Sequence, residues 1–187
     1  MLRSGKLIGE FEYFAVAVPI LDNKFVFEVR SPFVKQPGEI SFPGGKVEIG
    51  EEPYATACRE LEEELGITNP RFLYELDPLV TPFNYVIYPY MFQLSDSRMV
   101  LNPTEVRDVF LVPTELFLKP HRVGHVEVIL RPRDDFPFDC IPGGQNYPWK
   151  KGSYTIFFFF WGEHVIWGLT ARIAYEAANK LLQSGVP

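Results

Sequence analysis

Carboxylates are concentrated between residues 44 and 67, where glutamates recur at spacings that helix packing does not require. Glu60, Glu63 and Glu64 stand at positions i, i+3 and i+4, so a helix would place their carboxylates side by side on one surface. Each pair of like charges would destabilise that helix by roughly a few tenths of a kcal/mol unless a cation lay between them. Clustered carboxylate oxygens suit Mg²⁺ or Mn²⁺. The spacing therefore predicts a divalent metal site.

A helix over about residues 53–65 would position these glutamates. Pro53 suits its first turn, and Gly66 can adopt the left-handed conformation that ends a helix. At about 100° per residue, the apolar side chains form a stripe that we expect to be buried against a sheet. This stripe consists of Tyr54, Cys58, Leu61 and Leu65. The glutamates would face the opposite side.

The loop before this helix separates two interpretations of the glutamates. On its own, a run of glutamates on a helix is usually a solvated acidic face. Gly44 and Gly45, however, leave backbone groups where a metal or a phosphate could approach. Glu51 lies eight residues before Arg59, and a turn at Gly50 would let the two pair. The loop therefore favours a metal–diphosphate site.

From residue 45 to residue 67 the sequence resembles the Nudix box, G-x5-E-x7-R-E-U-x-E-E-x-G-U, in which U is aliphatic. Every fixed position matches: Gly45, Glu51, Arg59, Glu60, Leu61, Glu63, Glu64, Gly66 and Ile67. The resemblance implies an α/β protein, a Nudix-type α/β/α sandwich with a mixed sheet between helices. It also implies that Glu60, Glu63 and Glu64 bind Mg²⁺ or Mn²⁺. The Gly45 carbonyl would be a further ligand, and Glu51 and Arg59 would support the site.

The same resemblance implies hydrolysis of a diphosphate by metal-activated water, without a covalent intermediate. Divalent ions neutralise phosphoryl oxygens and lower the pKa of bound water. The general base of this family lies either in the box or in a later loop, so the expected catalytic residues are Glu63, Glu64 and Glu105. Glu105 precedes a predicted strand and is the first candidate outside the box, ahead of Glu127 and Glu163.

The residues around the box resemble the coenzyme A pyrophosphatase branch of the family. Its upstream signature is LLTxRS followed by a basic residue, a glycine and FPGG. The corresponding elements here are VFEVRS at 26–31, Lys35, Gly38 and FPGG at 42–45. Glu28 stands where the signature has threonine, Lys35 replaces arginine, and the spacing from Lys35 to Gly38 is one residue short. The resemblance extends over residues 26–173.

This branch implies hydrolysis of coenzyme A or acyl-coenzyme A to adenosine 3',5'-bisphosphate and 4'-(acyl)phosphopantetheine. The substrate-binding residues expected from the signature are Arg30, Lys35, Phe42 and Gly44. Other cations that could bind the 3'-phosphate, or could serve only solubility, are Arg131, Arg133, Lys150 and Lys151. The aromatic side chains that could line a pocket for adenine or the pantetheine arm, or else belong to the core, are Phe33, Phe83 and Tyr85.

Two alternatives stay open. The box recognises only the diphosphate, so the substrate could instead be ADP-ribose, NADH, a dinucleoside polyphosphate or a nucleoside triphosphate. The chain could also be a non-catalytic Nudix module that binds a nucleotide, although no box glutamate is lost. We expect Glu63→Gln to leave folding nearly intact and to abolish activity; unchanged turnover would remove the metal role of Glu63.

Length and composition agree with one domain over residues 1–187. The net charge of −6 argues against a nucleic-acid or anionic-membrane surface. Two cysteines without CxxC spacing and no signal-peptide pattern predict a reduced, cytoplasmic location. A homodimer would be typical of soluble enzymes.

The remaining pattern is sheet-rich. Strands are predicted at 11–20, 24–30, 39–42, 72–74, 85–94, 106–112, 123–131 and 153–161, with a hairpin turn at 21–23 and a short helix at 114–118 capped by Thr114. The apolar run at 155–161 is expected to be a buried central strand. The loop 131–152 is too long for a neutral connection. A helix over 164–183 is expected to end the chain.

Overall fold

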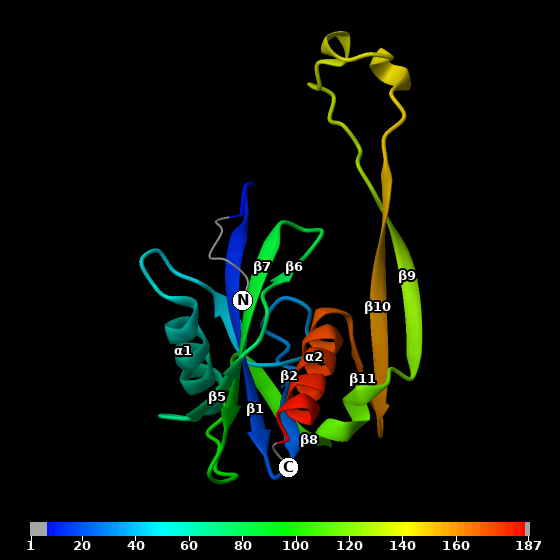
Figure 1. Ribbon diagram of the computed structural model, residues 1–187. Helices are drawn as coiled ribbons and strands as arrows, with labels where there is room; N and C mark the ends of the chain where they lie inside the picture. Colours follow the sequence, from blue (N-terminus) through cyan, green and yellow to red (C-terminus); the bar gives the residue numbers. More distant parts are fainter. Residues whose placement is uncertain (1–6, 186–187) are drawn as a thin grey trace.

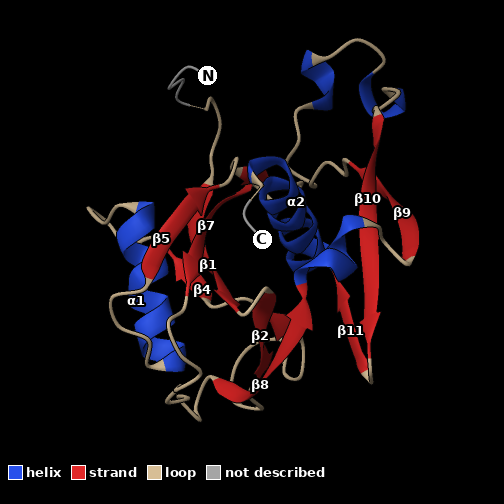
Figure 2. Ribbon diagram, turned by 60° about the horizontal axis from the view of Figure 1, so that its bottom comes forward, coloured by secondary structure: helices blue, strands red, loops and turns tan. Residues whose placement is uncertain are grey.

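A twisted mixed sheet forms the centre of the computed structural model, which describes residues 7–185 (Figures 1 and 2). The sheet contains β1 (Glu12–Leu21), β2 (Lys24–Arg30), β3 (Ile40–Ser41), β4 (Gly44–Lys46), β5 (Arg71–Glu75), β6 (Leu79–Val80), β7 (Tyr85–Gln93) and β8 (Val106–Pro113). Strands β1 and β7 pair in parallel, and the other pairings are antiparallel. Helix α1 (Pro53–Leu65) covers one face, and helix α2 (Gly168–Ser184) covers the other. The expected α/β/α sandwich is therefore confirmed.

The hairpin between β1 and β2 turns at Asp22 and Asn23, as the sequence predicts. Both residues have positive φ angles, 48° and 58°. Asp and Asn tolerate this left-handed conformation better than most residues, and two such residues in succession match the twist of the strands that they join. The turn sets the register that pairs Ile20 with Phe25.

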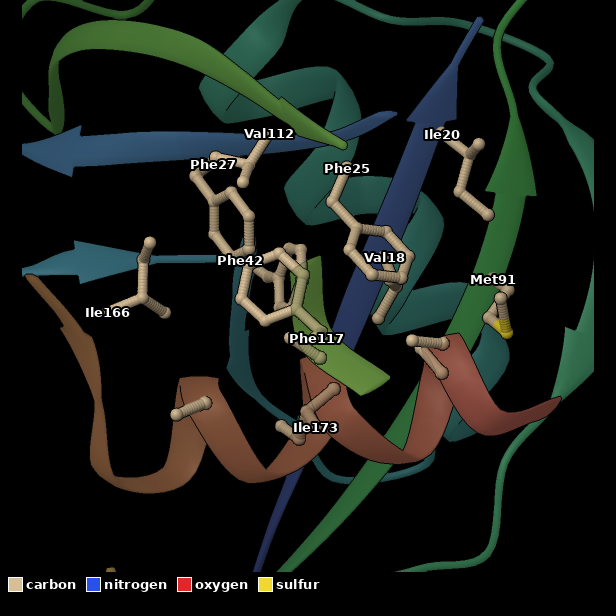
Figure 3. Close-up of a cluster of buried hydrophobic side chains, with 14 of the residues drawn as sticks. Val18, Ile20, Phe25, Phe27, Phe42, Met91, Val112, Phe117, Ile166 and Ile173 are labelled. Atoms are coloured by element: carbon tan, nitrogen blue, oxygen red, sulfur yellow. The ribbon is translucent and has the colours of Figure 1, made fainter. Parts of the chain in front are cut away.

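The two faces of β2 belong to two different cores. Phe25 and Phe27 point toward α2 and pack in the cluster drawn in Figure 3. Val26 points the other way and packs in the cluster around Leu61 of α1. Because side chains alternate along a strand, Glu28 faces α1 together with Val26. A carboxylate thus lies on the side of the sheet that carries the glutamate-rich helix.

A second sheet lies beyond α2, and it corrects the prediction of a buried central strand at 155–161. It consists of β9 (Arg122–Ile129), β10 (Lys151–Trp161) and β11 (His164–Trp167), with β10 in the middle. Of the side chains in β10, Phe159 is fully buried, whereas Phe160 and Trp161 are 39% and 38% exposed. One face of this small sheet packs on α2 and the other meets solvent, so the aromatic run is only half covered (Figure 2).

The final helix begins later than expected. Residues 164–167 form β11, which pairs with β10 through a turn at Gly162, where φ is 58°. Helix α2 starts only at Gly168. A short apolar run fits a strand and a helix equally well, and here the adjacent partner strand decides the outcome.

Residues between β9 and β10 form the tip of a hairpin that stands away from the body of the protein (Figure 1). The tip contains two short 3₁₀ turns, η2 (Phe138–Cys140) and η3 (Gly144–Asn146). Aromatic side chains pack within the tip, with the ring of Phe136 5.0 Å from that of Phe138 and 5.4 Å from that of Trp149.

The short helix at 114–118 is a 3₁₀ helix, η1 (Thr114–Leu118). Its N-cap position is occupied by Pro113 and has no side-chain hydrogen bond, so the expected Thr114 cap is wrong. The helix is positioned by its buried Phe117, whose ring lies 4.7 Å from that of Phe159. Within residues 7–185, no helix has the length and apolar character needed to cross a membrane.

Candidate active site

Helix α1 has the limits that the sequence predicts. Pro53 occupies its first turn, and Gly66 ends it with a φ angle of 67°. The amide of Gly66 donates to the carbonyl of Glu62 at 2.9 Å, and the amide of Ile67 donates to Leu61 at 3.3 Å. These two bonds satisfy carbonyls that would otherwise lack a partner at the end of the helix.

The buried face of α1 differs from the expected stripe. Its buried residues are Thr56, Ala57, Glu60, Leu61, Glu64 and Leu65. Tyr54 is 42% exposed and Cys58 is half-buried, so both lie at the margin of the stripe. Glu60 and Glu64 are buried because β4 passes over that side of the helix. The glutamates therefore face a backbone segment rather than open solvent.

The two glycines of β4 make this close approach possible. The amide of Gly44 donates a hydrogen bond to Oε2 of Glu64 at 3.0 Å. A Cβ atom at Gly45 would overlap the carboxylate of Glu60. Neither glycine has a positive φ angle, so the requirement is for space. The structure thus brings Glu60 and Glu64 onto the loop that the sequence indicated.

Arg59 connects the loop to the helix. Its guanidinium contacts Glu51 at 3.1 Å, Glu60 at 2.8 Å and Glu63 at 2.9 Å. Glu51 also accepts hydrogen bonds from the hydroxyl of Thr56 at 2.7 Å and from the amide of Glu48 at 3.2 Å. Hydrogen bonds, first from Arg59 and then from Thr56, lower the pKa of Glu51 to about 2. Glu63 also pairs with Arg59, but its side chain is 51% exposed, so it lies at the solvent-facing edge of the glutamate cluster.

We expect Glu51→Ala to lower the free energy of unfolding by about 1–2 kcal/mol, because charged hydrogen bonds to Arg59 and Thr56 are lost in a partly buried position. Urea denaturation measures this change. Glu52→Ala is the control, because Glu52 is exposed and makes no side-chain cap. Equal stability of the two variants would show that the Glu51–Arg59 pair does not stabilise the loop.

Glu28 is a buried carboxylate that the sequence analysis did not place in the site. Its residue is 1% exposed, and its Oε1 accepts a hydrogen bond from the hydroxyl of Ser41 at 2.7 Å. Its Oε2 is buried and has no hydrogen-bond partner within the part of the chain that the structure describes. The available signal was a single charged residue inside the otherwise apolar run FVFEV of β2.

The buried carboxyl groups have strongly altered proton affinities. Burial, followed by the charges of Glu28 and Glu60, raises the pKa of Glu64 to about 9. Burial also raises the pKa of Glu28 to about 7, partly offset by the hydrogen bond from Ser41 and by the charge of Arg30. The pKa of Glu60 is raised by burial, although Arg59 counteracts the shift. These groups repel one another when ionised, so the cluster favours protons or another cation.

Glu105 approaches the cluster from the loop before β8. Its Oε1 accepts a hydrogen bond from the side-chain amide of Asn102 at 3.1 Å, and its carbonyl accepts one from the amide of Ser31 at 2.8 Å. The backbone amide of Asn102 donates to the backbone carbonyl of Glu64 at 3.0 Å. The loop is thereby tied both to the end of α1 and to the end of β2. The charge of Glu105 contributes to the raised pKa of Glu64.

The other two candidate bases belong to the second sheet. Glu127 lies on β9, 3.5 Å from Lys151. Glu163 lies in the turn between β10 and β11 and lines a pocket with His164. Glu105 is therefore the candidate outside the box that the structure brings to the glutamates.

The donor set fits a hard divalent cation. Within residues 7–185, no three His, Cys, Asp or Glu side chains are arranged to hold a metal ion as they stand. Arg59 instead forms ion pairs with both Glu60 and Glu63. Yet Glu60 is buried against the backbone of Gly45, Glu64 is buried against Gly44, and Oε2 of Glu28 has no partner among the described residues. A cation that displaces protons from these carboxyls would remove their repulsion.

In the absence of metal, we expect stability to fall as the pH rises from about 5 to 9. Glu64 and Glu28 have pKa values in the folded state, about 9 and about 7, above the ordinary 4.5. The unfolded chain therefore releases these protons first, and the stabilisation present below pH 4.5 is lost as the pH passes through the folded values. Melting temperatures measured in EDTA test this. In the Glu64→Gln variant, the melting temperature should depend less on pH. An identical pH dependence in the two proteins would contradict the raised pKa of Glu64.

The expected substrate-binding residues have different surroundings. Arg30 donates from Nε to the carbonyl of Lys35 at 3.0 Å, and the side chain of Lys35 is exposed. Phe42 is 4% exposed, and its ring stacks on that of Phe27 at 4.5 Å. The side chain of Phe42 is therefore part of the core (Figure 3), which corrects its assignment to the substrate. The amide of Gly44 is bound to Glu64.

The three aromatic residues proposed for a pocket do not all meet. Phe83 and Tyr85 lie near one another, with ring centroids 6.5 Å apart, and Tyr85 packs on Phe14 at 4.9 Å. Phe33 is 81% exposed, and among the described residues its ring has no aromatic contact with either of them. Phe83 is also exposed, at 62%, so it and Phe33 do not belong to the core.

Comparison with known proteins identifies the family. Residues 13–131 match the NUDIX domain model, so the chain belongs to the Nudix family and is a Nudix pyrophosphohydrolase. The chain is 34% identical over 185 residues to the peroxisomal coenzyme A diphosphatase NUDT7 of Mus musculus, covering 91% of this chain and 70% of that protein. It is 30% identical over 183 residues to the mitochondrial coenzyme A diphosphatase NUDT8 of Homo sapiens, with the same coverage.

Structural comparison supports the fold. The crystal structure of a MutT/nudix family protein from Enterococcus faecalis matches with a TM-score of 0.58 at 14% identity, covering 97% of this chain and 66% of that chain. The match therefore includes the second sheet as well as the central one.

Proposed function

We propose that this protein hydrolyses the diphosphate bond of coenzyme A or acyl-coenzyme A in a reaction that depends on Mg²⁺ or Mn²⁺. The observation that carries the proposal is the similarity to two coenzyme A diphosphatases over 91% of the chain. The buried carboxylates of α1 against Gly44 and Gly45 support it, because they provide oxygen ligands beside the backbone of β4.

In this proposal Glu60, Glu64 and the Gly45 carbonyl hold the cation, and Glu63 joins them from the rim. The bound cation would neutralise phosphoryl oxygens and lower the pKa of a bound water. Arg59 orients Glu60 and Glu63 through its two hydrogen bonds, and Glu51 holds Arg59 in place.

Proton transfer is assigned to Glu105 in the same proposal. It lies on a loop fixed to α1 and β2, and a hydrogen bond from the side chain of Asn102 orients its carboxylate. Hydrolysis of the diphosphate then needs no covalent bond to the protein, because water supplies the attacking oxygen and a carboxylate accepts its proton.

The substrate surface is proposed to extend from Arg30 and Lys35 along the loop before β3. Next to this loop lies a pocket of about 460 Å³ between the central sheet and β11. Its lining includes Gly38, Arg107 and His164. Cationic donors here could bind the 3'-phosphate that distinguishes coenzyme A from ADP-ribose and NADH.

The test is incubation of the purified protein with Mg²⁺ or Mn²⁺ and with coenzyme A, ADP-ribose, NADH, diadenosine polyphosphates and nucleoside triphosphates in separate reactions. Chromatography should show adenosine 3',5'-bisphosphate released preferentially from coenzyme A. Preference for another diphosphate would overturn the coenzyme A assignment and keep the Nudix chemistry. No turnover of any compound would favour a nucleotide-binding module. The single domain, the cytoplasmic location and a homodimer remain predictions.

If Arg107 binds the 3'-phosphate, Arg107→Ala should raise KM for coenzyme A by about tenfold and leave KM for dephospho-coenzyme A unchanged. Initial rates with both substrates measure the difference, because they share the diphosphate and differ only in the 3'-phosphate. Arg98→Ala is the control, since Arg98 is exposed and pairs with Asp96 outside this pocket. An equal rise for both substrates would contradict recognition of the 3'-phosphate by Arg107.

A further inference from the structure

Glu28 is a buried carboxylate outside the Nudix box whose second oxygen lacks a partner. Ser41 donates to Oε1 at 2.7 Å, while Oε2 is buried and has no hydrogen bond from any residue between 7 and 185. Leaving a buried polar atom unpaired costs roughly 1–3 kcal/mol, and more for a charged group. A strand residue that contributed only to stability would be apolar here, like Val26 before it. The unpaired oxygen therefore requires a partner that the described residues do not supply.

The position of Glu28 indicates what that partner is. Alternation along β2 directs Glu28 toward α1, on the same side as Val26. Glu60 and Glu64 also lie on that side as buried residues of α1, and, after burial, the charges of Glu105 and Glu60 raise the pKa of Glu28. After burial, the charge of Glu28 is the next largest cause of the raised pKa of Glu64, in agreement with their placement between β2 and α1. When ionised, these acidic neighbours supply acceptors but no donor, so only a proton or a cation can satisfy Oε2.

We propose that Glu28 is an additional carboxylate of the metal site, whose Oε2 binds a divalent cation directly or through a water of that cation. Ser41 fixes the carboxyl group by its hydrogen bond to Oε1, so Oε2 is left oriented for the cation. This inference rests on the metal dependence in the proposed function, but it does not depend on which diphosphate is hydrolysed. Threonine in the family signature at this position could not supply a carboxylate.

Arg30, whose charge acts on Glu28, must be considered as the partner instead. Its charge lowers the pKa of Glu28, but its Nε donates to the carbonyl of Lys35 at 3.0 Å, and it forms no hydrogen bond with Oε2. Arg59 contacts Glu51, Glu60 and Glu63, but not Glu28. Neither arginine therefore satisfies the free oxygen.

The test is titration of the full chain with Mn²⁺ without substrate, with free Mn²⁺ measured by electron paramagnetic resonance. Glu28→Gln keeps the shape and can still accept from Ser41, and Glu28→Thr provides a smaller side chain suited to a strand. Both variants should bind Mn²⁺ at least about tenfold more weakly than the original protein. The control is Glu115→Gln, because Glu115 is exposed on η1; its affinity should not change.

Wild-type affinity in either folded variant would overturn the assignment, as would failure of the unchanged protein to bind Mn²⁺. If neither variant folds, infrared difference spectra of the unchanged protein with ¹³C-labelled glutamate serve instead. Spectra of Glu60→Gln and Glu64→Gln identify the bands of those two residues. Loss of protonated-carboxyl absorption from these bands alone on adding Mg²⁺ would overturn the inference, and loss of a further band would support it. Weaker Mn²⁺ binding by the variants, together with no hydrolysis of coenzyme A, would remove the proposed substrate and leave the role of Glu28 standing.

Discussion

Glu64→Gln is expected to reduce metal-dependent hydrolysis by about a thousandfold, because a cation that stabilises the developing charge contributes several kcal/mol, and about 4 kcal/mol corresponds to that factor. The same substitution should stabilise the metal-free protein by about 2 kcal/mol at pH 8. Glu64 is 3% exposed and has a pKa of about 9, so folding requires this carboxyl to take up a proton, whereas glutamine is already neutral. Its side-chain oxygen can still accept the hydrogen bond from Gly44.

Rates with the best substrate and urea denaturation in EDTA measure the two effects. Glu62→Gln is the matched control in the same turn of α1, because Glu62 is exposed. It should change neither property appreciably. An active Glu64→Gln variant would eliminate Glu64 as a metal ligand. A less stable variant would mean that the buried carboxyl has a stabilising partner besides the amide of Gly44.

Gly45→Ala is expected to have the second largest effect, a loss of activity of about a hundredfold or more. Its Cβ would overlap the carboxylate of Glu60, so either that side chain or β4 must move. Because a shift of about 1 Å in a site that positions reacting groups can cost a hundredfold, the displacement need not unfold the protein. The φ angle of Gly45 is not positive, so alanine adds a steric conflict without backbone strain.

Steady-state rates and circular dichroism together test this prediction. Gly152→Ala is the control, since a Cβ at Gly152 on β10 would meet Val128 at an ordinary 3.5 Å. Full activity of Gly45→Ala would mean that the position of Glu60 in the structure does not matter for the reaction. Loss of the folded signal would instead locate the cost in the packing of β4 on α1.

Local patterns predicted the parts of the site that depend on neighbouring residues. The limits of α1 followed from Pro53, from Gly66 and from the helical spacing of the apolar residues between them. The eight-residue spacing of Glu51 and Arg59 predicted their ion pair. These features depend on helix geometry and on a loop of a few residues. They could therefore be derived without knowing the sheet.

Burial of the glutamates could not be derived in the same way. Glu60 and Glu64 are covered by β4, and Glu28 faces them from a strand that is distant in sequence. Helical periodicity specifies which residues share a side of a helix, but not what lies over that side. The same limitation explains Phe42, which the signature placed at the substrate and the sheet placed in the core.

The hairpin tip between β9 and β10 is a part of the chain that can be changed without disturbing the two cores. Its aromatic residues pack on one another, and the tip stands away from the two cores (Figure 1). Substitutions or changes of length there leave the packing of α1 and α2 untouched. The hairpin tip is consequently a suitable place to attach a fluorophore or an affinity tag.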